Sequence, residues 1–314
     1  MELINNLSLL LVSYVAISSV ANLFSSVEGR VMYKTIKTEY GSIYDCVDIY
    51  KQPAFDHPLL RNHKIQMRPS FALQRMPNNT SSTGTTKYGL KNECPRGTVP
   101  IRRMSKEEQL RSDFSFTQEL GQSSTGFEVN PDLFGDNRTR LYTIWGQGVD
   151  GVMHGCYDTR CPGFVIVSTQ IPLNVVFKDI SVAGGSQFYV KLSIAQDKAT
   201  GHWWLLYSEK DDDPDQQIGY WPNTLFTNIK QDAQVIRWGG IVYSDKPISP
   251  PMGSGRRDCH YRRIAVAAPG ASADVPLETS QSRCYRVGDN SYKDKFWGYS
   301  FWFGGLGGDS KHCN

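Results

Sequence analysis

The chain has 314 residues, of which 39% are hydrophobic and 21% are charged, and its formal net charge is +3. This composition excludes a protein with many membrane spans and also a wholly disordered chain. Aromatic residues make up 12% of the chain, and 28 Gly and 16 Pro provide turn formers. Such a mixture is typical of many short strands joined by tight turns, so we expect an all-β fold.

Residues 1–29 are expected to form a targeting signal. Residues 9–20 are an apolar run, LLLVSYVAISSV, and small residues follow it near Ala21. The run is too short to span a bilayer comfortably, although no Lys or Arg precedes it as in a standard signal peptide. We favour a cleaved secretory signal over a membrane anchor, which predicts an extracellular protein with no membrane segment after cleavage.

Charge divides the remaining chain into a front segment, residues 30–112, and a body, residues 113–314. The front segment holds 15 Lys and Arg against 7 Asp and Glu, whereas the body holds 19 against 22. The basic residues of the front segment are scattered among Pro, Asn and Thr, so nucleic-acid binding is not expected. An electrostatic contact between the front segment and the body explains the asymmetry at least as simply.

Local patterns predict few elements in the front segment. The polar tract at residues 78–86 predicts an exposed loop. Ser105 and Glu108 carry a capping-box signature for a short helix that ends near Arg111. This is the only helix that we expect.

The body is predicted to consist almost throughout of strands. Alternation of apolar and polar residues predicts strands at residues 163–170, 186–194, 201–207, 235–243 and 295–303. The acidic run at residues 209–215 is expected to be a solvated hairpin loop, because it lacks the oxygens at fixed positions that a calcium site needs. Residues 146–151 match G-x-G-x-x-G, but the residues after them do not begin a helix, so a dinucleotide site is not expected.

The seven cysteines are consistent with an oxidising compartment. Their spacing predicts local disulfides that pair Cys46 with Cys94, Cys156 with Cys161, and Cys284 with Cys313. Cys259 is left over, either unpaired or joining two chains. Neither the cysteine spacing nor the six dispersed His residues match a zinc site, so we expect no metal and no cofactor. Sequons for N-glycosylation occur at Asn78, Asn79 and Asn137.

A series of short strings runs along the chain after the signal. They are CPRGTVPIRR at 94–103, VNPDLFGDNRTRL at 129–141, GCYDTRCPGFV at 155–165, GHWWL at 201–205, GYWP at 219–222, WGG at 238–240, MGSG at 252–255 and CY at 284–285. Together, in this order, they resemble the neprosin-like secreted plant proteins. The resemblance covers nearly the whole chain after the signal.

The resemblance implies an activation propeptide over residues 30–112 and a catalytic domain over residues 113–314 that is an antiparallel β-sandwich. The propeptide is a small mixed segment that contacts the body, and the same three disulfides are implied. The implied activity is that of a glutamic endopeptidase, which cleaves proline-containing peptides after proline at acidic pH in the cell wall or apoplast. Five aromatic residues would line the substrate cleft, with core packing as the alternative: Trp203, Trp204, Tyr220, Trp221 and Trp238.

Peptide hydrolysis by carboxyl groups needs one ionised and one protonated carboxyl. The two catalytic glutamates of the family fall on Ser124 and Ile241, neither of which can hold or deliver a proton in this way. Glu128 is a weak substitute, because residues four apart in a strand lie about 13 Å apart. The chain between Arg103 and Gly126 is also short for the family, through a deletion or a misassigned exon, which would leave one sheet short of strands and with an exposed edge.

The sequence therefore predicts a secreted neprosin-like glutamic peptidase homologue whose catalysis is impaired or lost. The alternative is a non-catalytic secreted module that binds peptides or cell-wall polymers. A third interpretation is a degenerate product that folds poorly.

Overall fold

The computed structural model describes residues 29–73, 89–105, 108, 122–149, 152–182, 184–211, 213–233, 236–242, 244, 246–253, 259–265 and 282–313. The predicted signal, apart from Gly29, and the polar tract with Asn78 and Asn79 lie outside these residues. Within the described part of the chain, no helix is both long and apolar enough to cross a membrane. The chain forms two compact units: the first is Met1–Ile180 with Phe188–Ala233, and the second is Ser181–Gln187 with Gln234–Asn314.

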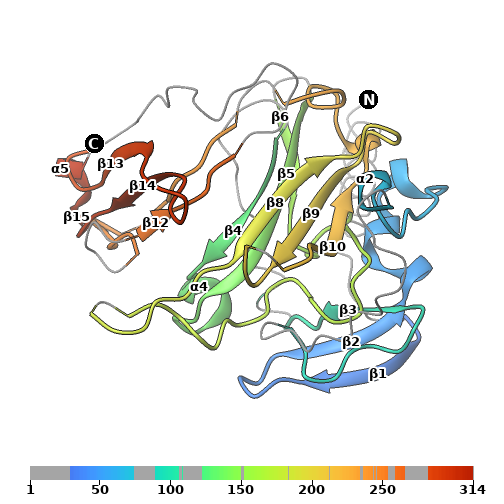
Figure 1. The fold of residues 1–314 in the computed structure, drawn as a ribbon. Coiled ribbons are helices and arrows are strands. Elements are labelled where there is room, and N and C mark those ends of the chain that lie inside the picture. The colour runs from blue at the N-terminus through green and yellow to red at the C-terminus, as the bar shows by residue number, and fades with distance from the viewer. Residues whose placement is uncertain are drawn as a thin grey trace, which may run out of the picture. The chain divides into compact units, whose positions relative to one another are not determined.

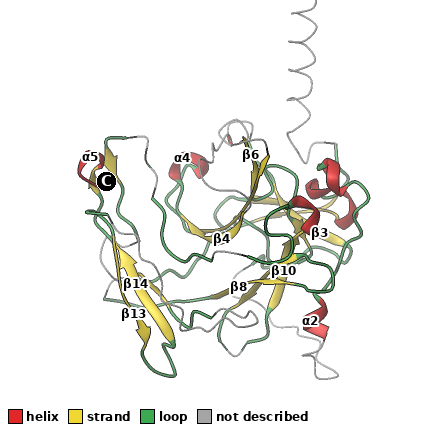
Figure 2. Ribbon diagram, turned by 90° about the horizontal axis from the view of Figure 1, so that it is seen from above, coloured by secondary structure: helices red, strands yellow, loops and turns green. Residues whose placement is uncertain are grey.

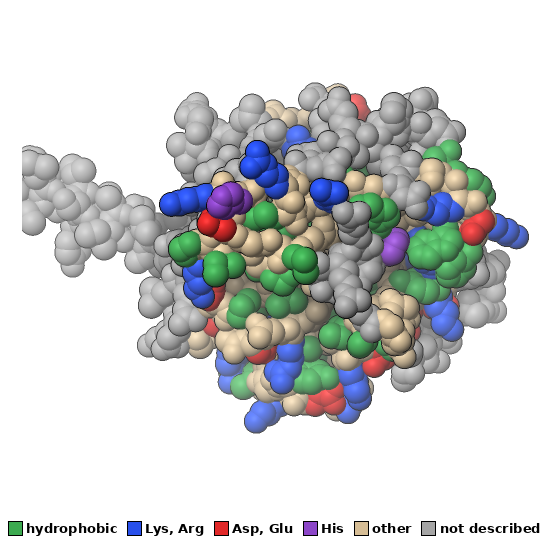
Figure 3. All heavy atoms as spheres, turned by 90° about the vertical axis from the view of Figure 1, so that its left-hand side faces the viewer, with side chains coloured by type: hydrophobic (Ala, Val, Ile, Leu, Met, Phe, Trp, Pro, Cys, Tyr) green, Lys and Arg blue, Asp and Glu red, His purple; other side chains and the backbone are tan. Residues whose placement is uncertain are grey.

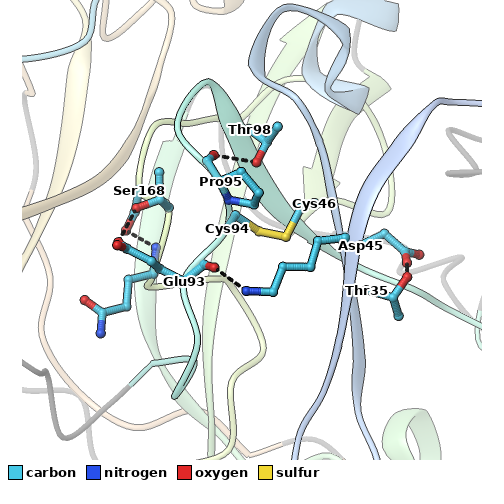
Figure 4. The surroundings of a disulfide bond; sticks show 11 residues. Thr35, Asp45, Cys46, Glu93, Cys94, Pro95, Thr98 and Ser168 are labelled. Atoms are coloured by element: carbon cyan, nitrogen blue, oxygen red, sulfur yellow. Dashed lines mark hydrogen bonds between the residues drawn. A yellow bond between two sulfur atoms is a disulfide. The ribbon is translucent and has the colours of Figure 1, made fainter.

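The front segment contributes a three-stranded antiparallel sheet to the first unit (Figure 1). Its strands are β1 (Met32–Lys37), β2 (Ile43–Asp48) and β3 (Thr98–Arg102), in that order. The predicted disulfide between Cys46 and Cys94 joins β2 to the chain before β3 (Figure 4). Thr98 at the start of β3 donates a hydrogen bond to the carbonyl of Pro95, which tightens the turn after Cys94.

Short helices between β2 and β3 were not predicted from the sequence. They are η1 (Ile49–Lys51), η2 (Pro53–Asp56), η3 (Pro58–Leu60) and α2 (Ser70–Leu73). Pro53 and Pro58 begin two of them, where the fixed φ of proline suits a helix start and its missing N–H costs nothing. The side chains of Asp48 and His57 cap η1 and η3. Each helix has only three or four residues, too few for a helical periodicity to appear.

A second antiparallel sheet of the first unit has the order β4-β5-β6. Its strands are β4 (Gln122–Glu128), β5 (Arg140–Val149) and β6 (Val152–Tyr157), and α4 (Pro131–Phe134) lies between β4 and β5. The Asn130 side chain caps α4, and Gly135 ends it with a φ of 72°, a left-handed conformation that suits glycine. Residues 146–149, the described part of the glycine-rich match, belong to β5, which pairs antiparallel with β6 and does not lead into a helix.

The third sheet of the first unit has the order β7-β10-β9-β8, and its pairs are antiparallel. Its strands are β7 (Val165–Ile166), β8 (Lys191–Gln196), β9 (Trp203–Ser208) and β10 (Gln216–Trp221), followed by η4 (Asn223–Leu225). The acidic run connects β9 to β10 and is the predicted hairpin loop. Side chains on both faces of this sheet are buried, so the sheet lies inside the core of the first unit.

The second unit contains two small antiparallel sheets. One has the order β12-β14-β13 and the other pairs β11 with β15. The elements are β11 (Ile248–Ser249), β12 (Cys259–Tyr261), β13 (Arg286–Tyr292), β14 (Tyr299–Gly304), β15 (Gly308–Asp309) and α5 (Ser310–Cys313). Figure 2 shows β13 and β14 side by side. The predicted disulfide between Cys284 and Cys313 ties α5 to the chain before β13.

The all-β fold class with antiparallel sheets is confirmed, whereas the sandwich arrangement stays a prediction. The strand predicted at 201–207 is found as β9, whereas the one predicted at 163–170 is reduced to β7 and the one predicted at 295–303 begins only at Tyr299, as β14. The other two predicted strands also differ from the structure. Residues 236–242 form no strand, because the adjacent Gly239 and Gly240 provide no side chains for a strand to pack. The strand predicted at 186–194 begins only at Lys191, since residues 186–189 are exposed and their alternation marks no buried face.

The capping box predicted at Ser105 is present. The Ser105 amide donates to Glu108 Oε2 at 2.9 Å, and the Glu108 amide donates to Ser105 Oγ at 3.1 Å. Apart from Ser105 and Glu108, the residues of this predicted helix lie outside the described part of the chain.

Candidate functional site

Ser124, one of the two positions where the resemblance expects a glutamate, lies on β4. In the register of β4 and β5, Ser124 is opposite Ile144, Gly126 is opposite Tyr142, and Glu128 is opposite Arg140. Because side chains alternate along a strand, these residues share one face of the sheet. The Ser124 hydroxyl is hydrogen-bonded to the hydroxyl of Tyr142. Position 124 therefore faces a hydroxyl group of its own sheet.

Tyr142 lies across Gly126, and no larger residue fits there without displacing the ring. A Cβ atom at Gly126 would be 3.1 Å from Tyr142 Cε1. Tyr142 is also stacked on Tyr157, with ring centroids 5.9 Å apart and planes within 8°. Burial raises the pKa of both tyrosines, so their hydroxyls stay protonated and act as hydrogen-bonding groups.

Glu128 lies in a buried polar network at the end of β4. Its carboxyl is hydrogen-bonded to Tyr157 and Asn130. Burial, together with the nearby carboxyl of Asp158, raises the pKa of Glu128. Asp158 is itself buried and accepts hydrogen bonds from the Thr143 amide at 2.7 Å and from Asn174 Nδ2 at 2.6 Å. Burial also raises the pKa of Asp158, so both carboxyls bind a proton more readily than exposed carboxyls do.

Three buried arginines surround the ring of Phe134 beside this network. The guanidinium carbons of Arg102, Arg140 and Arg160 lie 5.1, 4.2 and 5.5 Å from the ring centroid. Arg140 makes two hydrogen bonds to the carboxylate of Asp136, at 2.6 and 2.8 Å, and these hold the pKa of Asp136 well below its usual range. Arg102 pairs with Glu108 at 2.6 Å. Arg102 and Arg140 are thus each neutralised by a carboxylate, which indicates a structural role for these two residues.

Ile241, the other position where the resemblance expects a glutamate, lies in the second unit. Its side chain is 90% exposed, within the irregular residues 236–242. A Cβ atom at the preceding Gly240 would lie 2.5 Å from Met252 Sδ and 2.8 Å from Phe303 Cε2. Gly240 is therefore packed against its own unit, while the side chain after it projects into solvent.

Three of the five aromatic residues that were expected to line a cleft are fully buried. Trp204, Tyr220 and Trp221 are 0% exposed, and the rings of Trp204 and Tyr220 are 4.7 Å apart. Trp203 is half-buried and donates from Nε1 to the carbonyl of Ile229 at 2.8 Å. Trp238 is half-buried in the second unit. Trp204, Tyr220 and Trp221 therefore belong to the core, which is the alternative that the sequence left open.

Sequence reasoning missed two histidines that lie against Tyr220. His63 Nε2 is 2.7 Å from the Tyr220 hydroxyl, and the ring of His202 stacks on Tyr220 at 4.9 Å. The rings of the two histidines are 5.2 Å apart. Burial lowers the pKa of His63, and burial followed by the neighbouring His63 lowers the pKa of His202 to about 4. Neither lies in a recognisable motif, and 139 residues separate them, so no local signal connects them.

The remaining predicted sites are also placed. Asn137 is exposed in the turn after α4, as a glycosylation site would require. The pair Cys156 and Cys161 forms a disulfide as predicted. Among the residues that the structure describes, no three His, Cys, Asp or Glu side chains are grouped to hold a metal ion.

Comparison with known families accounts for most of the chain. The family model described as Neprosin matches residues 107–306. The model described as Neprosin activation peptide matches residues 35–144. The two matches overlap at residues 107–144, so the boundary at residue 113 stays a prediction. The matches cover more than half of the chain and include both its front segment and its body. This protein belongs to the neprosin family of peptidase-like proteins, and it carries the activation peptide of that family.

Proposed function

We propose that this protein is a secreted neprosin homologue that no longer catalyses the glutamic endopeptidase reaction of its family. One observation carries the proposal: neither position that corresponds to a catalytic glutamate has a carboxyl group. Position 124 is a serine hydrogen-bonded to Tyr142, and position 241 is an exposed isoleucine.

The reaction itself explains why both replacements matter. Water that attacks a peptide carbonyl must lose a proton, and the leaving amine must gain one. Two neighbouring carboxyls do this because their interaction keeps one ionised and the other protonated at acidic pH. A serine hydroxyl and an isoleucine side chain have no pKa in the range that this exchange needs.

Glu128 does not replace the missing pair in this proposal. It lies four residues along β4 from Ser124, about 13 Å in an extended strand. Its hydrogen bonds to Tyr157 and Asn130, and its proximity to buried Asp158, fit a structural carboxyl of the first unit.

The alternative function is binding of peptides or cell-wall polymers without hydrolysis. Exposed apolar side chains in the second unit favour it, including Ile241, Ile248, Phe296 and Leu306. Figure 3 shows apolar side chains interspersed with basic and acidic ones on one face of the molecule.

Cleavage of a proline-containing peptide at acidic pH tests the proposal. The natural protein should be inactive, and the double variant Ser124→Glu, Ile241→Glu should cleave the peptide. The matched control is the double variant Ser124→Gln, Ile241→Gln. Its side chains have nearly the same shape as Glu but do not ionise, so it should be inactive. Cleavage by the natural protein would overturn the proposal, because another acid would then perform the reaction.

If neither the natural protein nor the Glu variant cleaves the peptide, direct binding separates the remaining cases. Saturable binding of the uncut peptide or of a wall polysaccharide would support the binding function. A folded protein that binds neither would argue against it.

A further inference from the structure

The front segment and the body share one hydrophobic core. Five residues of the front segment are buried in one cluster with body residues of β5, β7, β9 and β10. These front-segment residues are Val47, Ile49, Leu60, Val99 and Ile101. Their body neighbours in this cluster include Leu141, Trp145, Ile166 and Trp221. Burial of apolar side chains is the main favourable term in folding, and here neither part completes the cluster alone.

A second cluster covers the opposite face of the β7-β10-β9-β8 sheet. Ala54 of the front segment is buried against Val165, Trp204 and Tyr220 of the body, and Phe55, Ile65 and Phe71 pack around them. Trp204 and Tyr220, two of the aromatic residues that were expected in a substrate cleft, therefore pack beneath the front segment.

The polar contacts between the two parts include many hydrogen bonds between uncharged groups, and carboxylates accept others: Asp197 of the body accepts from Gln66 and Ser70, and Glu93 accepts from Thr169. Gln52 donates to the carbonyl of Ile166 at 3.0 Å and accepts from its amide at 2.8 Å, as a neighbouring strand would. The Tyr44 hydroxyl donates to the Leu173 carbonyl at 3.2 Å. Backbone amides of Leu90 and Cys94 donate to carbonyls of the body, at 2.9 and 2.8 Å. These groups are buried or nearly so, and separation would leave them unpaired until water reached them.

Several basic residues of the front segment have acidic partners within that segment. Arg30 pairs with Asp56, Arg102 with Glu108, and Arg103 with Asp45. The contact between the two parts is thus largely apolar packing and hydrogen bonds, with carboxylates among the acceptors, and no salt bridge joins the two parts among the ion pairs of the described residues. Such an interface should depend only weakly on salt.

From these contacts we infer that the activation-peptide segment is a permanent part of the fold, which stays docked on the body after the chain between them is cut. No disulfide links the two parts among the pairs that the structure contains, since Cys46 and Cys94 both belong to the front segment. Retention would therefore be non-covalent. The inference does not depend on whether the protein hydrolyses peptides.

Cutting the connecting chain tests this directly. Residues 113–119, outside the described part, are replaced by the recognition sequence of a site-specific protease, and the purified protein is cut at neutral pH. A non-reducing denaturing gel should show two fragments. Native size-exclusion chromatography should show one peak that contains both, in 0.1 M and in 1 M NaCl. Separation of the fragments at either salt concentration would overturn the inference.

Two neighbouring leucines provide matched variants. Leu60 is 0% exposed in the shared core, whereas Leu59 is 61% exposed. In the cut protein, Leu60→Ala should increase the dissociation rate of the front fragment at least tenfold, and Leu59→Ala should leave it unchanged. If dissociation of the cut protein is too slow to measure, urea unfolding of the uncut protein provides a second readout.

All seven Trp residues lie in the body, so their fluorescence reports only on that part. Leu60→Ala in the front segment should shift the urea midpoint of this signal, and Leu59→Ala should not. An unchanged midpoint for Leu60→Ala would show that the body folds independently and would overturn the inference.

Discussion

Acidification should destabilise the first unit through His202. This side chain is 9% exposed, and its Nδ1 accepts a hydrogen bond from the Asn223 amide at 3.2 Å, which requires an unprotonated nitrogen. Its ring faces His63 and Tyr220. Burial and His63 lower the pKa of His202, and the charge of Asp197 opposes this lowering only in part. The folded protein therefore resists protonation of His202.

The sign and size of the effect follow from the pKa of about 4 in the folded state and about 6.5 in the unfolded chain. Below pH 6.5 the unfolded chain binds the proton first, so the contribution of His202 is complete above pH 6.5 and is lost as the pH falls to 4. The difference corresponds to about 3 kcal/mol of unfolding free energy. Urea unfolding at several pH values between 7 and 4 measures it.

The variant His202→Gln keeps an acceptor near the Asn223 amide but cannot be protonated in this range. Its unfolding free energy should fall less steeply between pH 6.5 and 4 than that of the natural protein. His260→Gln, which removes an exposed histidine of the second unit, is the control and should keep the natural slope. Equal slopes for the natural protein and His202→Gln would refute the reasoning.

Three further predictions concern stability and modification. Gly219→Ala should prevent stable folding or lower the unfolding free energy by about 3 kcal/mol, measured by urea unfolding, because its Cβ would lie 2.2 Å from the carbonyl oxygen of Val165. Asp136→Asn should lower the unfolding free energy by about 3 kcal/mol in the same assay, since it leaves buried Arg140 without its carboxylate; a loss below 0.5 kcal/mol would contradict this. Asn137→Gln should reduce the mass of protein secreted by eukaryotic cells by one N-glycan, and mass spectrometry that finds no such difference would exclude glycosylation there.

Much of the local structure could be predicted because its signals are short-range. The capping box at Ser105, the hairpin loop between β9 and β10 and the three disulfides each depend on residues close in sequence or on simple spacing. The strand pattern failed at residues 236–242, where two glycines interrupt the side chains that alternation needs. The 3-10 helices were missed because three or four residues are too few to show a period.

The candidate site depends even more on contacts between residues that are distant in sequence. Positions 124 and 241 were predicted from motifs alone, but Tyr142 as the partner of Ser124 appears only when β4 and β5 pair. The network of Glu128 and Asp158 likewise depends on chain segments that meet in space.

The sequence by itself determined the family, the all-β class and the disulfide pairs, because residue identity and spacing carry all three. Only the tertiary structure decided that Trp204 and Tyr220 are core, that His63 and His202 meet, and that the front segment shares a core with the body. Burial is a property of the assembled chain: an aromatic residue on a strand has the same local pattern whether a distant segment covers it or solvent does.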